Sequence, residues 1–135
     1  LPPGTGDIQL TIVQTAELDG VVVVTTPQEV ALIDARKAIG LFERVETPIL
    51  GIIENMSYFQ CPSDGKIYHI FGEGGGEREA AKLGVPLLGK IPLDISTRSG
   101  GDEGRPVALE DPGQNPVSAA FRQVAEQCAR VVLDR

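Results

Sequence analysis

The sequence predicts an α/β fold built on a parallel sheet. Three apolar runs, at residues 21–25, 49–53 and 85–91, consist mainly of β-branched and aliphatic residues without polar alternation. Such runs are typical of strands that are buried on both faces. Helical patterns separate the runs, so each strand–helix–strand unit is expected to cross over in the right-handed sense. A chain of 135 residues can bury a core of its own as a single domain.

The composition favours a globular protein, because 41% of the residues are hydrophobic and 23% are charged. The formal charge of −7 argues against a nucleic-acid partner. No apolar run approaches the ~18 residues that would predict a membrane span. Two cysteines, Cys61 and Cys128, are too few for a disulfide framework. We therefore expect a cytoplasmic protein that contacts neither nucleic acid nor membrane.

The chain begins with turn residues, LPPGTGD, ahead of a helix that Asp7 can cap and that runs to about Thr15. An Asp-Gly pair then turns the chain into the first strand. The opening residue is Leu1, not Met, and the segment after it resembles a strand-to-loop junction whose strand is missing. We therefore expect residues 1–135 to be part of a longer protein.

The first strand is followed by a predicted helix. Thr26 is expected to be its N-cap, with Pro27 at the first helical position and Glu29 completing a capping box. Its apolar face recurs at helical spacing through Leu32, Ala35, Ile39 and Phe42.

Residues 47–76 are the most irregular part of the chain. They open with the strand at 49–53, turn polar at Glu54 and Asn55, and continue into a Cys-Pro pair at Cys61. A turn and a short apolar return then lead to a glycine cluster at 72–76. An irregular loop at the carboxyl end of a strand is where open α/β sheets place their chemistry.

The last third is predicted to contain a short helix at 77–83, the strand at 85–91 and a long loop that reaches Asn115. Asn115 is the expected N-cap of the final helix, with Pro116 at its first position. The apolar stripe of that helix consists of Val117, Phe121, Val124, Cys128 and Val131.

The glycine-rich segments suggest phosphate binding, but the residues next to them do not fit a P-loop. A P-loop needs Gly-Lys-Ser/Thr, because the lysine neutralises phosphate and the hydroxyl holds Mg²⁺. Both Gly-Lys pairs, at Lys66 and Lys90, are followed by isoleucine. The cluster at 72–76 contains no basic residue, so we interpret it as a mobile connector.

Two strand exits carry candidate binding residues. Asn55 can read the edge of a base by donating and accepting at once, or it can simply cap the turn. Pro92, Leu93 and Asp94 occupy the corresponding exit of the next strand. The two exits are expected to face one crevice, although residues 92–94 also fit an ordinary strand-to-loop exit.

The two cysteines differ in their surroundings. Cys61 lies in a polar loop, where it is either a thiolate ligand or a bystander thiol. Asp64 and His69 are its nearest possible co-ligands, at a spacing that is not typical of structural zinc sites. Cys128 falls on the apolar stripe of the last helix and is predicted to be a packed core thiol.

Taken in order, the motifs resemble the Mrp/Nbp35/ApbC family of MinD/ParA-type P-loop ATPases, which carry iron–sulfur clusters to apo-proteins. The resemblance rests on LPPGTGD at 1–7, TTPQ at 25–28, ENMSYF at 54–59, CP at 61–62, IFG and GGGE between 70 and 77, and LGKIPLD at 88–94. It implies that residues 1–135 are a single partial domain, the C-terminal portion of a three-layer α/β/α P-loop NTPase fold that lacks its P-loop half. No Walker A segment is present in this sequence, so we expect no ATP hydrolysis by these residues alone.

The resemblance also implies cofactors and a partner. Pro3 and Gly4 correspond to the switch region near the Mg²⁺ of bound ATP. Asn55 corresponds to an adenine-contacting residue, and Pro92, Leu93 and Asp94 to the loop on the other side of the adenine. Cys61 corresponds to the first cysteine of a Cys-Pro-x-Cys motif through which two subunits hold a bridging [4Fe–4S] cluster, so a homodimer and apo iron–sulfur acceptor proteins are expected.

One departure from the family pattern leaves alternatives open. Asp64 stands at the second cysteine position, so a symmetric dimer offers two thiolates where such clusters usually take four. Asp64 or an outside thiol could complete the site. The alternatives are a MinD/ParA-like ATPase switch without a cluster and a non-catalytic interaction remnant.

Overall fold

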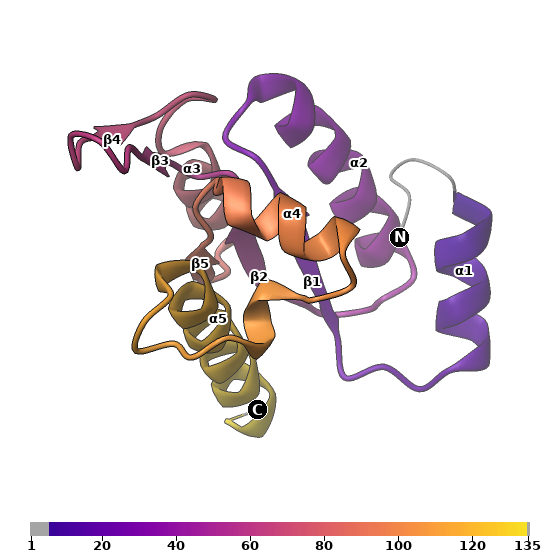
Figure 1. The fold of residues 1–135 in the computed structure, drawn as a ribbon. Helices are drawn as coiled ribbons and strands as arrows, with labels where there is room; N and C mark the ends of the chain where they lie inside the picture. Colours follow the sequence, from indigo (N-terminus) through magenta and orange to yellow (C-terminus); the bar gives the residue numbers. More distant parts are fainter. Residues whose placement is uncertain (1–5, 135) are drawn as a thin grey trace.

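The computed structural model describes residues 6–134 and contains a three-stranded parallel sheet with strand order β1-β2-β5. Helices α2 and α3 cover one face of the sheet and α5 covers the other (Figure 1). The predicted α/β architecture is therefore confirmed. These elements are β1 (Val21–Thr25), α2 (Glu29–Arg44), β2 (Ile49–Glu54), α3 (Gly75–Leu83), β5 (Leu87–Lys90) and α5 (Pro116–Leu133).

Strand β2 is the centre of the core because both of its neighbours are strands. Ile52, which is 0% exposed, packs with Val23 and Ala35 on the α2 and α3 face. The next residue, Ile53, packs with Leu88 on the α5 face. Successive side chains point to opposite faces, so burial of both faces explains the absence of polar alternation in this strand.

The predicted apolar faces of the two long helices are confirmed. The buried residues of α2 include Leu32, Ala35, Ile39 and Phe42, and the stripe of α5 packs on the cluster around Ile53 and Leu88. Asn115 caps α5, since its Oδ1 accepts from the amides of Val117 at 2.9 Å and Ser118 at 3.3 Å.

The start of α2 differs from the prediction. Its N-cap is Gln28, without a side-chain cap hydrogen bond, and the helix begins at Glu29. The predicted Thr26 capping box is wrong, and Thr26 instead hydrogen-bonds to the Gln28 side chain at 3.3 Å. The cause is tertiary, because the Pro27 carbonyl oxygen approaches Gly75 so closely that a Cβ there would lie only 2.6 Å from it. Residues 26–28 therefore pack against the start of α3 before α2 begins.

The long loop predicted between residues 94 and 115 is also wrong. It contains helix α4 (Ile95–Asp102) and a 3₁₀ turn, η1 (Val107–Leu109). Helix α4 has no buried residue and includes Gly100 and Gly101. Glycine is a poor helix former, and a helix without a buried face leaves no apolar stripe in the sequence.

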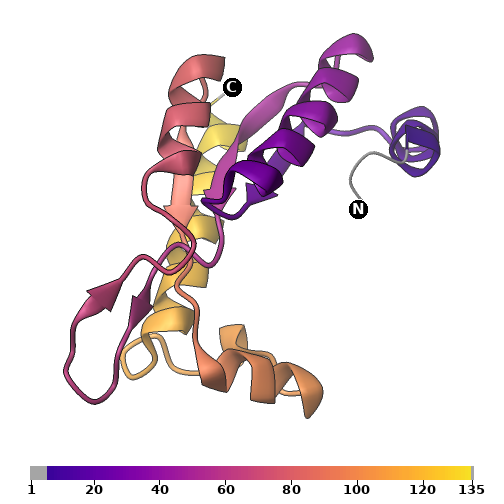
Figure 2. The ribbon, with the colours of Figure 1, turned by 90° about the horizontal axis from the view of Figure 1, so that it is seen from above.

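A small antiparallel hairpin, β3 (Phe59–Gln60) and β4 (Ile67–Tyr68), projects beyond the carboxyl ends of the sheet strands. Helix α4 lies at the same end of the molecule (Figure 2). We call this end of the sheet the carboxyl rim, defined by the exits of β1, β2 and β5 together with the hairpin.

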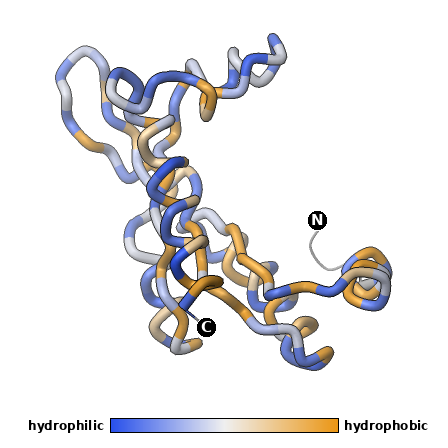
Figure 3. The backbone as a smooth tube through the Cα atoms, turned by 90° about the horizontal axis from the view of Figure 1, so that it is seen from below, coloured by the Kyte–Doolittle hydropathy of each residue, from blue (hydrophilic) through white to orange (hydrophobic). Residues whose placement is uncertain are grey.

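Strand β1 forms one edge of the sheet. Within residues 6–134 it pairs only with β2, and Val24 is 59% exposed. Helix α1 (Gly6–Thr15) lies to the side beyond this edge and carries hydrophobic residues (Figures 2 and 3). None of the helices in the described part of the chain is long and apolar enough to cross a membrane.

Candidate functional site

Asn55 lies directly after β2, at the carboxyl rim. Its backbone amide donates to Thr25 O of β1 at 2.7 Å, and its Oδ1 accepts from the Met56 amide at 2.9 Å. The side chain therefore caps the turn, as the simpler interpretation predicted. Met56 has a φ of +50°, a left-handed conformation that non-glycine residues adopt at a cost of about 1 kcal/mol.

The turn after Asn55 is joined to the exit of β5. The Ser57 amide donates to Ile91 O at 3.0 Å, and the Leu93 amide donates to Tyr58 O at 2.8 Å. The two strand exits that were predicted to be neighbours are thus held together by backbone hydrogen bonds.

Asp94 caps the helix that follows this exit. Its Oδ2 accepts from the Thr97 amide at 3.0 Å and from the Ser96 hydroxyl, so it is the N-cap of α4. Burial acts to raise the pKa of Asp94, but the hydrogen bonds from Ser96 and Thr97 outweigh it and lower the pKa. Pro92 and Leu93 lead from β5 into this cap.

A groove of about 570 Å³ runs along the free edge of β1. Its walls come from α1 and α2, through residues such as Gln9, Ile12, Ala35 and Ala38, and Asn55 lies at one end. Pro92, Leu93 and Asp94 do not line it. The structure therefore brings the two exits side by side without enclosing them in one hollow. Pro3 and Gly4 lie outside the described residues.

Cys61 lies in the projecting hairpin, immediately after β3. It is partly exposed, and its backbone is held by Lys66 O at 2.9 Å and by the Gly65 amide at 2.8 Å. The side chain is thus carried on an ordered turn beyond the sheet, outside the two core clusters.

Asp64 belongs to the same turn. Its carboxylate accepts from the Lys66 amide at 2.8 Å and from the Tyr68 hydroxyl at 2.8 Å. These two bonds lower the pKa of Asp64, and the Cys61 thiol adds a smaller effect in the same direction. Asp64 and Cys61 therefore belong to one hairpin turn, in which the Asp64 carboxylate is already engaged by Lys66 and Tyr68.

The other predicted co-ligand is directed elsewhere. His69 Nε2 lies 3.4 Å from a Glu73 carboxylate oxygen. Among the described residues, no three His, Cys, Asp or Glu side chains gather as they would around a metal ion. Cys128 is partly buried and packs against the cluster that includes Val124, which confirms the predicted packing but places the thiol at the margin of the core.

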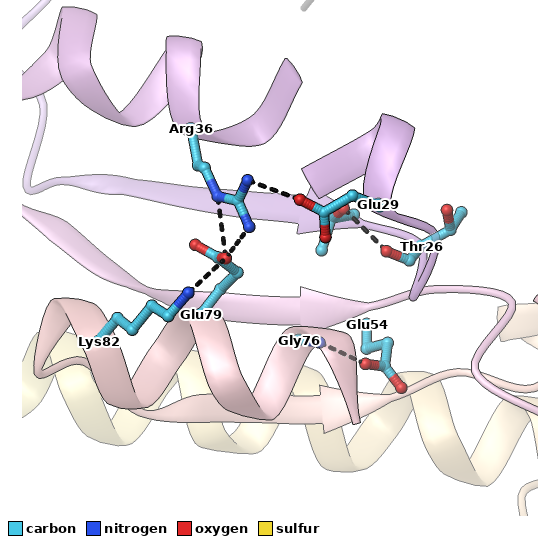
Figure 4. Close-up of polar contacts among 8 residues, drawn as sticks. Thr26, Glu29, Arg36, Glu54, Gly76, Glu79 and Lys82 are labelled. Carbon is cyan, nitrogen blue, oxygen red and sulfur yellow. Dashed lines mark hydrogen bonds and ion pairs between the residues drawn. The ribbon is translucent and has the colours of Figure 1, made fainter. Parts of the chain in front are cut away.

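The sequence analysis missed the role of Glu54, the last residue of β2. Its side chain is among the most buried of the described residues at 1% exposure, and its Oε2 accepts from the Gly76 amide at 2.6 Å (Figure 4). Gly75 and Gly76 are the first two residues of α3. Glu54 therefore occupies the anion position at this helix N-terminus, which leaves the glycine cluster a packing role in place of the mobile connector that we expected.

Comparison with solved structures defines the class of the fold. A nucleotide-binding protein from Archaeoglobus fulgidus, solved in complex with ADP, superposes with a TM-score of 0.67 at 44% identity, covering 78% of this chain and 43% of that one. The Pyrococcus furiosus cell division ATPase MinD gives a TM-score of 0.63 at 26% identity, covering 84% of this chain and 43% of that one. The fold is thus that of MinD-like P-loop NTPases.

Sequence comparison then identifies the family. Residues 1–129 match the profile of the NUBPL iron-transfer P-loop NTPases of the ParA group, and the chain belongs to this family. It is 51% identical to an iron-sulfur cluster carrier protein from Pyrococcus furiosus over 93% of this chain and 42% of the relative. It is 50% identical to the carrier protein from Escherichia coli over 96% of this chain and 35% of the relative.

A plant protein is also among the similar sequences. The Arabidopsis thaliana protein named as an iron-sulfur protein required for NADH dehydrogenase, mitochondrial, is 48% identical over 96% of this chain and 41% of its own length. The chain therefore spans about two fifths of the curated relatives that it matches.

Proposed function

We propose that this chain supplies the adenine-facing exit and the cluster hairpin of an ATP-dependent iron–sulfur cluster carrier. One observation carries the proposal: Cys61 is partly exposed on a hairpin that continues directly from the Asn55 turn, at the carboxyl rim of the sheet. The names of the relatives, which are iron-sulfur cluster carrier proteins, support the same activity.

The cargo is an iron–sulfur cluster held between two copies. We propose a symmetric dimer, because Cys61 is the one cysteine on the hairpin and two copies would bring two such thiolates together. Two Cys61 thiolates would bind the cluster, and the two neighbouring Asp64 carboxylates are the groups in this chain best placed to complete a set of four. Clusters of the [4Fe–4S] type usually take four thiolates, so this donor set predicts a labile cluster that suits transfer to apo iron–sulfur proteins.

The nucleotide is proposed to bind at the strand exits. The Asn55 amide has both a donor and an acceptor for the edge of adenine, while Pro92, Leu93 and Asp94 lie across the neighbouring exit. Pro3 and Gly4 are proposed to lie near Mg²⁺ bound to the phosphates. The similar Archaeoglobus fulgidus protein was solved in complex with ADP, which supports nucleotide binding by proteins of this fold.

Anaerobic reconstitution with iron and sulfide tests the cargo. Visible absorbance and iron counting are expected to show a cluster in the wild-type chain and its loss in Cys61→Ser, whereas the control Cys128→Ser retains it. Asp64→Cys restores the second thiolate and is expected to increase the iron retained per dimer. A wild type that takes up no iron, or one that Cys61→Ser matches, would contradict the proposal.

Titration with ADP and GDP tests the adenine exit. Asn55→Ala is expected to weaken ADP binding and leave the weaker GDP binding unchanged, because the side chain reads the base. Gln114→Ala, an exposed amide far along the chain from the exits, is the control. Equal effects on both nucleotides would argue against base recognition by Asn55.

A second candidate function is a MinD/ParA-like ATPase switch that has no cluster. It is favoured by Asp64, which stands where the family motif has its second cysteine and is already engaged by Lys66 and Tyr68. This function predicts ATP-dependent dimers whose formation is the same in Cys61→Ser. The cytoplasmic location stays a prediction.

A further inference from the structure

The side chain of Glu54 joins the end of a sheet strand to the start of a helix from within the protein interior. Its Oε1 accepts from the Ser57 hydroxyl at 2.5 Å and its Oε2 accepts from the Gly76 amide at 2.6 Å. Glu54 is 1% exposed and Ser57 is 2% exposed. Both carboxylate oxygens are therefore satisfied away from water, which is the condition for burying such a group without a large penalty.

The segment that Glu54 holds connects the two parts of the proposed site. Asn55 begins it, Ser57 lies in its middle, and β3 of the cysteine hairpin follows at Phe59. Its backbone is also bonded to Thr25 O at 2.7 Å and to Ile91 O at 3.0 Å. Those two bonds fix the turn to the exits of β1 and β5, and the Ser57–Glu54–Gly76 contact fixes it to α3.

The geometry of α3 is adapted to this contact. A Cβ on Gly76 would lie 2.8 Å from Oε2 and 3.1 Å from the Cβ of Glu54. Gly76 sits in a helix, where alanine has the higher propensity, so helix formation alone does not account for glycine. The close approach of the carboxylate does.

We propose that Glu54 is a positioning residue that fixes the adenine-facing turn and the cysteine hairpin in one arrangement, by tying Ser57 to the N-terminus of α3. The expected effect on nucleotide and iron binding rests on the proposed function. The fixing of the turn rests on the hydrogen bonds alone. Loss of the tie is expected to loosen Asn55 and Cys61 together, because the same short segment leads to both.

Native-state amide exchange tests the geometry without nucleotide or iron. In Ser57→Ala, exchange at the amides of Asn55 and Leu93 is expected to accelerate about tenfold, the equivalent of one lost hydrogen bond. The Ile52 amide, which donates to Pro86 O at 3.0 Å, should stay unchanged. Glu54→Gln keeps the shape of the side chain and one acceptor oxygen for Gly76, so it should protect these amides better than Glu54→Ala. The inference would be overturned if exchange accelerated equally at all amides, or if it did not accelerate at any of them.

The functional arm measures ADP affinity and iron uptake in the same variants. Ser57→Ala and Gly76→Ala are expected to weaken both by severalfold, whereas Asn55→Ala weakens only the first and Cys61→Ser only the second. If the wild type binds neither ligand, the proposed function fails while the exchange result still decides the positioning role. If exchange is local but both ligands bind normally, Glu54 holds the turn without acting on the site and the inference is overturned.

Discussion

Arg36 of α2 reaches across to Glu79 of α3, donating from Nε at 2.9 Å, while Nη2 contacts the same Oε1 oxygen (Figure 4). Arg36 also pairs with Glu29 at 2.9 Å, and Lys82 lies 3.8 Å from Glu79. This network joins α2 and α3, the two helices that cover one face of the sheet. Glu79 is only 5% exposed, so its buried charge needs the Arg36 guanidinium to balance it.

The Arg36–Glu79 pair predicts a loss of stability on acidification. The hydrogen bond from Arg36 lowers the pKa of Glu79, against the opposing effect of burial. A lowered folded-state pKa contributes stability above the unfolded value of about 4.3, and this contribution is lost as the pH falls through the folded value. Glu79→Gln is expected to lower the free energy of unfolding by about 1 kcal/mol at neutral pH, with a difference from wild type that shrinks in acid.

Urea denaturation between neutral and acid pH measures this difference. Glu126→Gln is the matched control, because Glu126 is 58% exposed and lies 3.5 Å from Arg122, an arrangement worth about 0.5 kcal/mol or less. A gap between Glu79→Gln and wild type that stays constant with pH would show that the charge of Glu79 is not what joins the helices.

In the hairpin, the contact between Tyr68 and Asp64 predicts a change in the pKa of Tyr68. The pKa of Tyr68 is raised because its hydroxyl donates to Asp64, with smaller contributions from desolvation and from Cys61. A raised folded-state pKa contributes stability below the unfolded value of about 10, which is lost as the pH rises through the folded value. Asp64→Asn is expected to lower the pKa of Tyr68. Tyrosinate absorbance in a Tyr58→Phe background, which leaves one of the two tyrosines, measures it, and an unchanged midpoint would argue against the Asp64 bond.

Sequence reasoning worked where a pattern is local and repeated. The unbroken run of β2 reflects burial of both faces, as Ile52 and Ile53 show by packing on opposite sides. The same expectation is only partly met in β1, where Val24 is exposed. The stripe of α5 and the Asn115 cap are likewise read from spacing within one element. The motif resemblance selected Asn55 and Cys61 as site candidates because it compares residue types in order, and their roles stay predictions.

What sequence reasoning missed depends on contacts between distant segments. Glu54 and Gly76 are 22 positions apart, and neither residue type predicts the other. Thr26 is a good N-cap residue, but the contact between Pro27 and Gly75 decides where α2 begins. Helix α4 has no buried face to mark it in the sequence.

The Asn115 cap predicts a modest and specific destabilisation. Asn115→Ala removes the acceptor for the amides of Val117 and Ser118, and is expected to lower the free energy of unfolding by about 1 kcal/mol. Asn115→Ser should recover most of this loss, because serine also caps helices well. The exposed neighbour Gln114→Ala is the control. Equal stability of the alanine and serine variants would show that the cap contributes little to α5.

The free edge of β1 predicts self-association of the 135-residue chain. A strand of four valines and a threonine has the composition of an interior parallel strand, yet within residues 6–134 it pairs on one side only. Unpaired strand edges of this kind join to other chains. Sedimentation equilibrium is expected to show concentration-dependent oligomers, and Val24→Lys is expected to reduce them by placing a charge on the edge.

Val30→Lys is the matched control for this edge, since Val30 is 69% exposed on α2 while Val24 is 59% exposed on β1. Both substitutions remove an exposed valine and add the same charge, so a general effect of net charge on association would affect the two variants equally. Association through the β1 edge is expected to weaken in Val24→Lys alone. A wild-type chain that sediments as a single monomer over the whole concentration range would contradict pairing at this edge.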